Sequence, residues 1–185
     1  MLTDVSALPG AVPAADGLDQ LVRAAQRGDR DAFAGLYRQF ARMVHGILLA
    51  RVPRLHTEDL VQDVFLTAME RLSSLRDPAA FGGWLAAIAR NRATDHLRRT
   101  PQMTELPETL RAAGADAAER SEALAILRAI RELPEAYRET LALRLVEGMT
   151  GPEIAARTGL TEGSVRVNLH RGMKQLRERL ERRPA

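Results

Sequence analysis

The chain has 185 residues, 45% of them hydrophobic, and a net charge of +3, which suits one ordinary globular domain or two small ones. It contains no cysteine, which excludes disulfides, thiolate metal sites and cysteine nucleophiles, and its four histidines are scattered without metal-ligand spacing. No run of 18 apolar residues exists, and Pro9, Gly10 and Pro13 interrupt the N-terminus, so neither a membrane anchor nor a signal peptide is expected. We expect a cytoplasmic protein that needs no metal or cofactor.

Nearly every segment has the apolar spacing of an α-helix, and no alternating strand pattern is convincing, which predicts an all-α fold. Residues 1–16 are rich in Ala, Pro and Gly and are expected to form a disordered tail. A first domain is expected over residues 17–100, with helices at 18–26, 32–52, 57–75 and 78–99. Asp29 is a natural N-cap for the second of these helices, Pro53 should end it, and Asp77 with Pro78 should begin the fourth.

Residues 101–120 are expected to be a flexible acidic linker, because Pro101, Pro107 and Gly114 break any helix there and the stretch is longer than most connections inside a domain. A second helical domain follows over residues 121–183, with helices at about 121–133 and 134–147 before a further helix pair. Its expected core consists of Leu124, Leu127, Ile130, Tyr137, Leu141, Leu145, Ile154, Val165, Leu169, Leu176 and Leu180.

Residues 150–172 have the layout of a helix-turn-helix. Thr150 with Glu153 forms a capping-box pattern, Gly159 lies where the first helix must stop, and Thr161 opens the second. Two helices joined by about three residues present the second one to a DNA major groove.

The last helix is amphipathic and basic. Residues 157–183 contain eight basic and three acidic side chains, and this excess of five positive charges suits a phosphate backbone. The outward face carries Ser164, Val167, Arg171 and Lys174, bordered by Arg166. Arg171 can reach a guanine or a phosphate, and Val167 a thymine methyl group. A solvated charged helix face is the alternative, although the helix-turn-helix context favours DNA.

Two other helix faces carry distinctive polar groups. The fourth helix has a polar stripe of Arg90, Asn91, Thr94 and Arg98. A side-chain amide flanked by arginines suits contacts with a base and with phosphates. Taken alone, the stripe fits an ordinary solvated helix face equally well. The outward face of the third helix is acidic and suits a basic protein partner, with Leu66 as an apolar anchor. Taken alone, that face fits an ordinary solvated surface better. It consists of Asp59, Gln62, Asp63, Leu66 and Glu70.

Together these stretches resemble a sigma factor of bacterial RNA polymerase, of the extracytoplasmic-function (ECF) group in the sigma-70 family. The resemblance spans nearly the whole chain and rests on residues 58–65 (EDLVQDVF), 81–99 (FGGWLAAIARNRATDHLRR), 133–134 (LP) and 165–171 (VRVNLHR), in this order. It implies a promoter-specificity subunit without catalytic activity, with a region 2 domain at 17–100 and a region 4 domain at 121–183. The linker would run through the polymerase toward the RNA exit path.

The resemblance also implies partners and residue roles. Asp59, Gln62, Asp63 and Leu66 would grip the clamp helices of the largest polymerase subunit, and the flap of the second-largest subunit is a further contact. Asn91, aided by Arg90, Thr94 and Arg98, would receive a flipped base of the minus-10 element, in a pocket shaped by residues 75–80. The minus-35 element would be read by Ser164, Arg166, Val167, Arg171 and Lys174. An anti-sigma factor that sequesters the chain is also expected.

The chain departs from the family pattern at Gly82–Gly83, where bulkier or polar residues are common, and at Asn168, where a basic residue is frequent. Two rival functions stay open. One is an autonomous regulator that dimerises on a palindromic operator; the other is an adaptor whose helix-turn-helix contacts only protein, which the basic C-terminal stretch opposes. An enzyme is the weakest interpretation, because no nucleophile with a base, phosphate-binding loop or metal cluster can be assembled.

Overall fold

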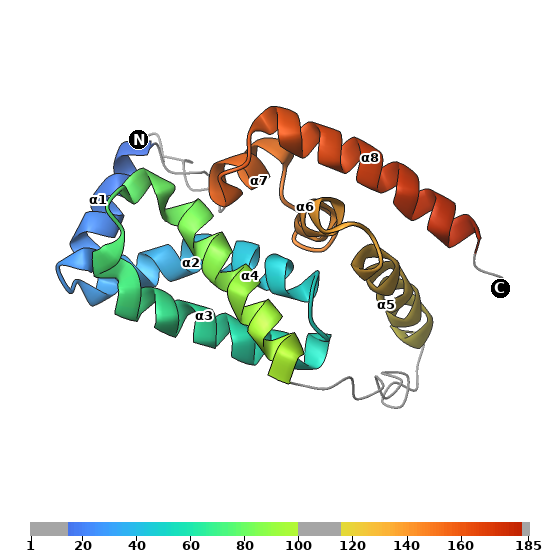
Figure 1. The fold of residues 1–185 in the computed structure, drawn as a ribbon, viewed down its shortest axis with the longest axis horizontal. Helices are drawn as coiled ribbons and strands as arrows, with labels where there is room; N and C mark the ends of the chain where they lie inside the picture. Colours follow the sequence, from blue (N-terminus) through green and yellow to red (C-terminus); the bar gives the residue numbers. More distant parts are fainter. Residues whose placement is uncertain (1–14, 100–115, 183–185) are drawn as a thin grey trace, which may run out of the picture.

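The computed structural model describes residues 15–99 and 116–182, and over these ranges the predicted all-α class is confirmed (Figure 1). Three short 3-10 turns accompany the helices, and no described helix is long and apolar enough to cross a membrane. The helices are α1 (Ala15–Gln26), α2 (Arg30–Leu49), α3 (Thr57–Arg71), α4 (Phe81–Arg99), α5 (Asp116–Arg131), α6 (Glu135–Leu145), α7 (Gly151–Thr158) and α8 (Glu162–Glu181).

The helix boundaries follow local chemistry. The Asp29 carboxylate caps α2 by accepting hydrogen bonds from the backbone nitrogens of Asp31 and Ala32, at 2.9 and 3.0 Å, as its position predicts. Helix α2 nevertheless ends at Leu49, earlier than the expected end near Pro53, because a turn precedes that proline. Helices α3 and α4 are shorter than predicted, since 3-10 turns replace the end of one and the start of the other, whereas α5 begins before the expected Ser121.

The N-terminal half, α1 to α4, is built around α2, which contacts the other three helices. Its buried side chains include Leu36, Phe40 and Met43 from α2 and Phe81 and Leu85 from α4. The rings of Phe40 and Phe81 pack edge to face with their centroids 5.0 Å apart. This core holds α3 and α4 side by side and leaves their polar faces outward.

The C-terminal half, α5 to α8, does not have the self-contained core expected from the sequence. A small cluster with Ile130, Leu133, Leu141 and Leu176 joins α5, α6 and α8. The apolar residues Leu143, Met149, Ile154, Ala155 and Val165 instead belong to the core of the N-terminal half. Helix α2 contacts α6 and α7, and α4 contacts α7, so the two halves form one continuous packed unit (Figure 1).

Two residues of the expected C-terminal core lie on the surface. Leu145 is 44% exposed and Leu180 is 36% exposed. Helical periodicity identifies an apolar face but not the neighbour that covers it. Here α2 packs against both α6 and α7, and α4 packs against α7. The C-terminal part of α8 consequently carries exposed apolar side chains, which include Met173 and Leu180.

Candidate nucleic-acid and polymerase interfaces

The acidic face of α3 lies on the surface as predicted. The residues Asp59, Gln62, Asp63 and Glu70 are exposed, and the Leu66 side chain is 55% exposed among them. The opposite face buries Leu60, Val61, Val64, Phe65 and Ala68. Sequence reasoning missed Met69, which is 54% exposed and enlarges the apolar centre beside Leu66. An apolar centre within an acidic rim matches the anatomy of a protein-binding surface.

The polar stripe of α4 divides into exposed and engaged members. Asn91, Thr94 and Arg98 are exposed. The Thr94 hydroxyl donates to the Arg90 carbonyl at 3.0 Å, so its proton is used within its own helix. The exposed side-chain amide of Asn91 can therefore both donate and accept hydrogen bonds to a ligand. Arg98, about two helical turns further along α4, supplies positive charge.

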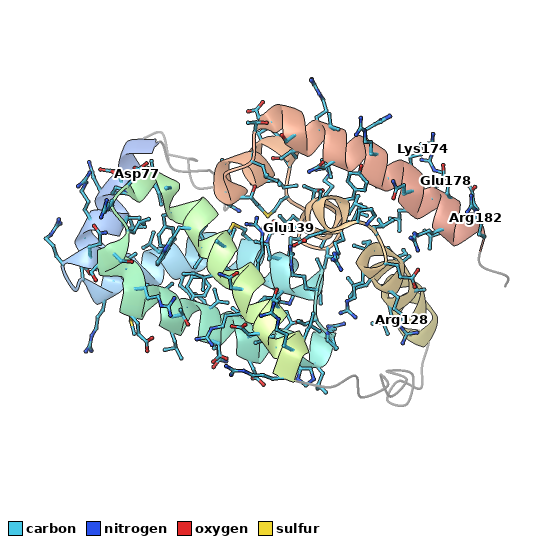
Figure 2. The ribbon with its side chains drawn as sticks, in the orientation of Figure 1. Asp77, Arg128, Glu139, Lys174, Glu178 and Arg182 are labelled. Carbon is cyan, nitrogen blue, oxygen red and sulfur yellow. The ribbon has the colours of Figure 1, made fainter. Side chains whose placement is uncertain are left out.

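Arg90 is not free in this structure, because it forms a bidentate ion pair with Glu139 of α6. Its Nε and Nη2 atoms donate to the two carboxylate oxygens at 3.0 and 2.8 Å. Arg51 approaches the same carboxylate at 2.9 Å and also pairs with Glu135 at 2.6 Å. The side chains of Arg51 and Glu139 are only 6% and 7% exposed. Glu139, labelled in Figure 2, thus joins the two halves of the chain.

Sequence reasoning missed this cluster. Glu139 lies 49 residues from Arg90, and its position on α6 carries no local sign of burial. The guanidinium of Arg51, with Arg90, compensates a carboxylate that would otherwise be unfavourable inside the protein. The hydrogen bond to Glu139 raises the pKa of Arg90.

The helix-turn-helix has the predicted local geometry. The Thr150 backbone nitrogen and the Glu153 carboxylate are 2.7 Å apart, and the Glu153 nitrogen donates back to the Thr150 hydroxyl, which completes the capping box. The hydrogen bonds from Thr150 lower the pKa of Glu153. Gly159 ends α7 with a left-handed φ of 76°, and Thr161 caps α8 by accepting from the Ser164 nitrogen at 3.1 Å.

The outward face of α8 also agrees with the sequence pattern. Ser164, Arg166, Val167, Arg171 and Lys174 are exposed, whereas Val165 is fully buried against the core. The Ser164 hydroxyl lies 2.8 Å from the Thr161 hydroxyl, so it supports the helix start as well as facing outward. Lys174 projects from the outer side of α8 in Figure 2. An exposed basic helix, begun by a tight turn, is suited to insertion into a major groove.

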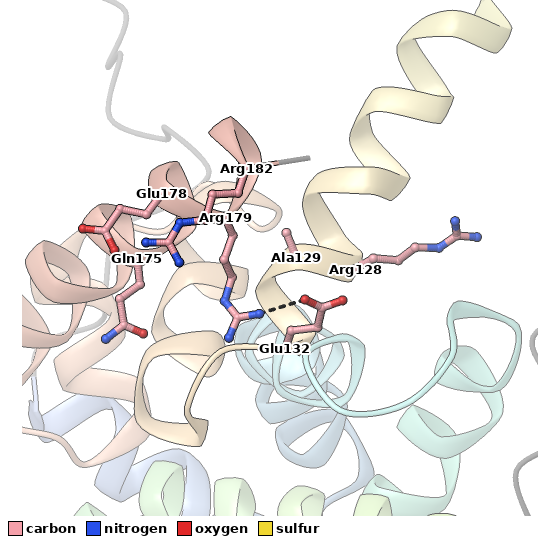
Figure 3. A pocket seen from close by; sticks show the side chains of 7 residues that line it. All are labelled: Arg128, Ala129, Glu132, Gln175, Glu178, Arg179 and Arg182. Carbon is pink, nitrogen blue, oxygen red and sulfur yellow. Dashed lines mark hydrogen bonds and ion pairs between the residues drawn. The ribbon is translucent and has the colours of Figure 1, made fainter. Parts of the chain in front are cut away.

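A groove of about 730 Å³ lies between α5 and α8. Figure 3 shows Arg179 of α8 reaching across it to Glu132, which follows α5, in an ion pair of 2.8 Å. Charged side chains of both signs line the rim, and they are Arg128, Glu132, Glu178, Arg179 and Arg182. The exposed apolar residues Met173 and Leu180 lie nearby on α8, beside the buried Leu176.

A basic helix-turn-helix half is thus joined to a half with an acidic helix face and a polar stripe, and this combination is typical of a DNA-binding specificity factor. Comparison with known families gives the class directly. Residues 36–101 match the family described as Sigma-70 region 2, and residues 123–176 match Sigma-70, region 4.

Comparison with curated relatives identifies the group within this family. The chain is 34% identical over 160 residues to RNA polymerase sigma factor CarQ of Myxococcus xanthus, across 83% of this chain and 91% of CarQ. It is 33% identical over 181 residues to the ECF RNA polymerase sigma factor BldN of Streptomyces coelicolor, across 89% of this chain and 67% of BldN. The chain therefore belongs to the ECF sigma factors, which direct promoter-specific transcription initiation by RNA polymerase and are not catalysts.

A solved structure extends the likeness to three dimensions. CnrH, in complex with the cytosolic domain of CnrY, superposes with a TM-score of 0.62 at 27% identity, covering 90% of this chain and 98% of CnrH. The similarity includes both halves of the chain and supports the helical arrangement described above.

Proposed function

We propose that this chain directs core RNA polymerase to promoters that have both a minus-10 and a minus-35 element. Residues 17–100 act as the region 2 domain, residues 121–183 as the region 4 domain, and residues 101–120 link them. The observation that carries the proposal is the separation of surface chemistry. An exposed acidic face lies on α3, while exposed amide and basic groups lie on α4 and α8.

The acidic face of α3 binds the clamp helices of the largest polymerase subunit. Asp59 and Asp63 supply charge complementarity, Gln62 supplies hydrogen bonds, and Leu66 with Met69 supplies the apolar centre. Negative charge on this face also keeps DNA away from it, so the helix serves protein binding alone.

The stripe of α4 captures one flipped minus-10 base at Asn91, whose amide can pair with the Watson–Crick edge of an extruded base. Thr94 and Arg98 line the path of that strand, and Arg98 neutralises phosphate charge. Arg90 joins them only when its ion pair with Glu139 is broken. The energy of base capture offsets part of the cost of unpairing and helps to nucleate promoter melting.

The start of α8 reads the minus-35 element in the major groove. Val167 contacts a thymine methyl group, and Arg171 reaches guanine or a phosphate. Arg166 and Lys174 bind the flanking phosphates, while Ser164 fixes the helix start. The groove between α5 and α8 receives the flap of the second-largest polymerase subunit.

A sequestering protein partner, an anti-sigma factor, is also proposed. Its support is the likeness to CnrH, which is solved with the cytosolic domain of CnrY bound to it.

The direct test is co-elution of the purified chain with sigma-free core polymerase, followed by transcription from a pool of genomic promoter fragments. Stable co-elution with new, specific transcripts supports the proposal and defines both promoter elements. A chain that does not bind core polymerase but shifts duplex DNA alone would instead be the autonomous regulator.

A further inference from the structure

Two of the four histidines meet at one end of the N-terminal half. His56 ends the 3-10 turn Arg54–His56, immediately before α3, and His96 lies in the last turn of α4. Their imidazole rings are in contact, with centroids 4.7 Å apart and ring planes inclined at 50°. In Figure 1 the turn before α3 and the end of α4 lie at the same corner of the fold. The pair has no metal-ligand spacing in the sequence, because tertiary packing alone brings the two residues together.

The two imidazoles have no other polar partner among the described residues. Both side chains are half-buried, and neither ring forms a hydrogen bond or an ion pair within the part of the chain that the structure describes. The other histidines differ, since the His45 ring is held by Glu147 at 2.6 Å and His170 is exposed on α8. Polar groups removed from solvent normally have a hydrogen-bond partner. The ring nitrogens of His56 and His96 are therefore available to a ligand.

The environment of the pair favours the neutral imidazole, which is the form that binds metal ions. Burial and the neighbouring His56 ring lower the pKa of His96, so His96 is neutral at neutral pH. A neutral imidazole has one nitrogen with a free lone pair, and imidazole nitrogen is a ligand that suits zinc, copper and nickel ions. The two rings thus offer a pair of nitrogen ligands to a divalent transition metal.

The separation of the rings fits one shared metal ion. A zinc ion binds imidazole nitrogen at about 2.0–2.1 Å, and its filled d shell imposes no preferred angle. With an angle of about 90–110° between the two bonds at the metal, the ring centroids are about 4.5–5.2 Å apart. The observed separation of 4.7 Å lies within this interval. A shared ion therefore requires only a choice of ring rotations and no change in the distance between the rings.

We infer that His56 and His96 form a two-histidine site for a divalent transition metal ion of the Zn²⁺ type, which fastens the turn before α3 to the end of α4. The described residues contain no group of three or more histidine, aspartate or glutamate side chains that could hold a metal, so water completes the coordination. With two protein ligands, the ion is held less tightly than in a four-ligand structural site and remains exchangeable. The inference goes beyond the proposed function and does not depend on it.

A metal ion at this position would act as a cross-link inside the N-terminal half. His56 and His96 belong to segments far apart in the sequence, so the unfolded chain does not hold the two rings together. An ion that binds the folded chain and not the unfolded one stabilises the folded state in proportion to its occupancy of the site. The helices that it braces, α3 and α4, carry the acidic face and the polar stripe.

Titration of the full chain, without a polyhistidine tag, with Zn²⁺ against a chromogenic zinc indicator tests the site. The chain has no cysteine, so thiolates do not compete for the ion. Loss of a residue that only supports a metal ligand costs about 10–100-fold in affinity, so His56→Gln and His96→Gln should each cost at least about tenfold. His170→Gln, which removes the exposed histidine of α8, is the matched control and should keep the wild-type affinity. Zinc binding of equal affinity in the wild type and the His56→Gln/His96→Gln double variant would overturn the inference, as would a wild-type chain that binds no zinc.

A second measurement on the wild-type chain locates the ion without any substitution at its ligands. Nuclear magnetic resonance of the imidazole nitrogens should show that Zn²⁺ shifts the signals of His56 and His96 and leaves that of His170 in place, with His170→Gln assigning the latter. Zn²⁺ should also raise the thermal unfolding midpoint of the wild type and of His170→Gln, and circular dichroism without zinc checks that every variant is helical. Shifts confined to His45 or His170 would overturn the inference. No polymerase or DNA is present, so these outcomes are separate from a failure of the proposed function.

Discussion

The imidazole of His45 in α2 and the carboxylate of Glu147, just beyond α6, are joined across the two halves of the chain by a contact of 2.6 Å between Nδ1 and Oε1. The hydrogen bond to Glu147 raises the pKa of His45, and burial opposes this only in part. Arg42 faces the same carboxylate at 3.8 Å, while Glu58 favours and Arg54 disfavours the imidazolium.

This pair predicts a pH-dependent stability. Because the folded state raises the pKa of His45, its contribution is complete below the ordinary histidine pKa of about 6.5 and is lost as pH rises through the folded-state value. We expect the free energy of unfolding to differ between wild type and His45→Gln more at about pH 6 than at about pH 9. Because both proteins contain the same other titratable groups, the difference between them removes the pH dependence that those groups contribute. One of them is His96, whose pKa is lowered by burial and by His56. An equal difference at both pH values would contradict it.

Removal of the buried charge at Glu139 should destabilise the fold. In Glu139→Gln, the Arg51 side chain, which is 6% exposed, loses part of its compensation, and we expect a loss of about 3 kcal/mol in the free energy of unfolding. Denaturant titration followed by the fluorescence of Trp84, the sole tryptophan, measures it. The control is Glu135→Gln, whose carboxylate pairs with the same arginine but is 64% exposed, so its expected cost is below about 1 kcal/mol. Equal costs would rule out burial as the cause.

Asn91→Ala should weaken promoter opening while leaving polymerase binding intact. Loss of the amide removes the proposed contacts to the flipped base, and we expect about a tenfold loss in open-complex formation, equivalent to about 1.4 kcal/mol. Permanganate footprinting of the melted strand measures opening, and co-elution measures polymerase binding. A parallel loss of both activities would show that α4 does not have a separate DNA role.

Asp63→Arg should disrupt association with core polymerase. The substitution places positive charge in the centre of the acidic face of α3, and like-charge contact with a basic partner surface should weaken binding by about tenfold or more. Asp31→Arg, at the exposed start of α2, reverses a charge outside both proposed polymerase contacts and serves as the control. Unchanged co-elution of Asp63→Arg would count against this face as the polymerase contact.

The two basic residues on α8 should differ in how they affect DNA binding. Arg171→Ala should cost about 1–3 kcal/mol and relax preference at one base of the minus-35 element. Lys174→Ala should weaken binding to all sequences alike and reduce the salt dependence by about one phosphate contact. Binding titrations of the polymerase complex on promoter variants at several salt concentrations separate these effects. If both variants lost the same affinity on every sequence, Arg171 would also be a phosphate contact and not a base contact.

The parts of the fold that could be predicted from sequence depend on neighbours within a few residues. The capping box of Thr150 with Glu153, the left-handed stop at Gly159 and the cap at Asp29 are such features, and the structure has all three. The exposed faces of α3 and α8 also follow from helical periodicity, which needs no knowledge of tertiary contacts.

The contacts between the halves could not be predicted, because they join residues far apart in the sequence. Nothing near Arg90 indicates its pairing with Glu139, and nothing near Gly82 indicates that the backbone carbonyl of Arg157, in α7, lies against it. The departure at Gly82–Gly83 from the family pattern was visible in the sequence, but its meaning required the three-dimensional contact. The exposure of Leu145 and Leu180 could not be predicted for the same reason, because the helix that packs against an apolar face determines which of its residues are covered.

The core shared by the two halves also makes their contact sensitive to temperature. Parting the halves exposes Leu143, Met149 and Ile154, which are almost completely buried, and exposure of apolar surface carries a positive heat-capacity change. Because apolar burial stabilises less on cooling, the contact weakens in the cold. The population of chains in which the two halves have separated should therefore rise on cooling.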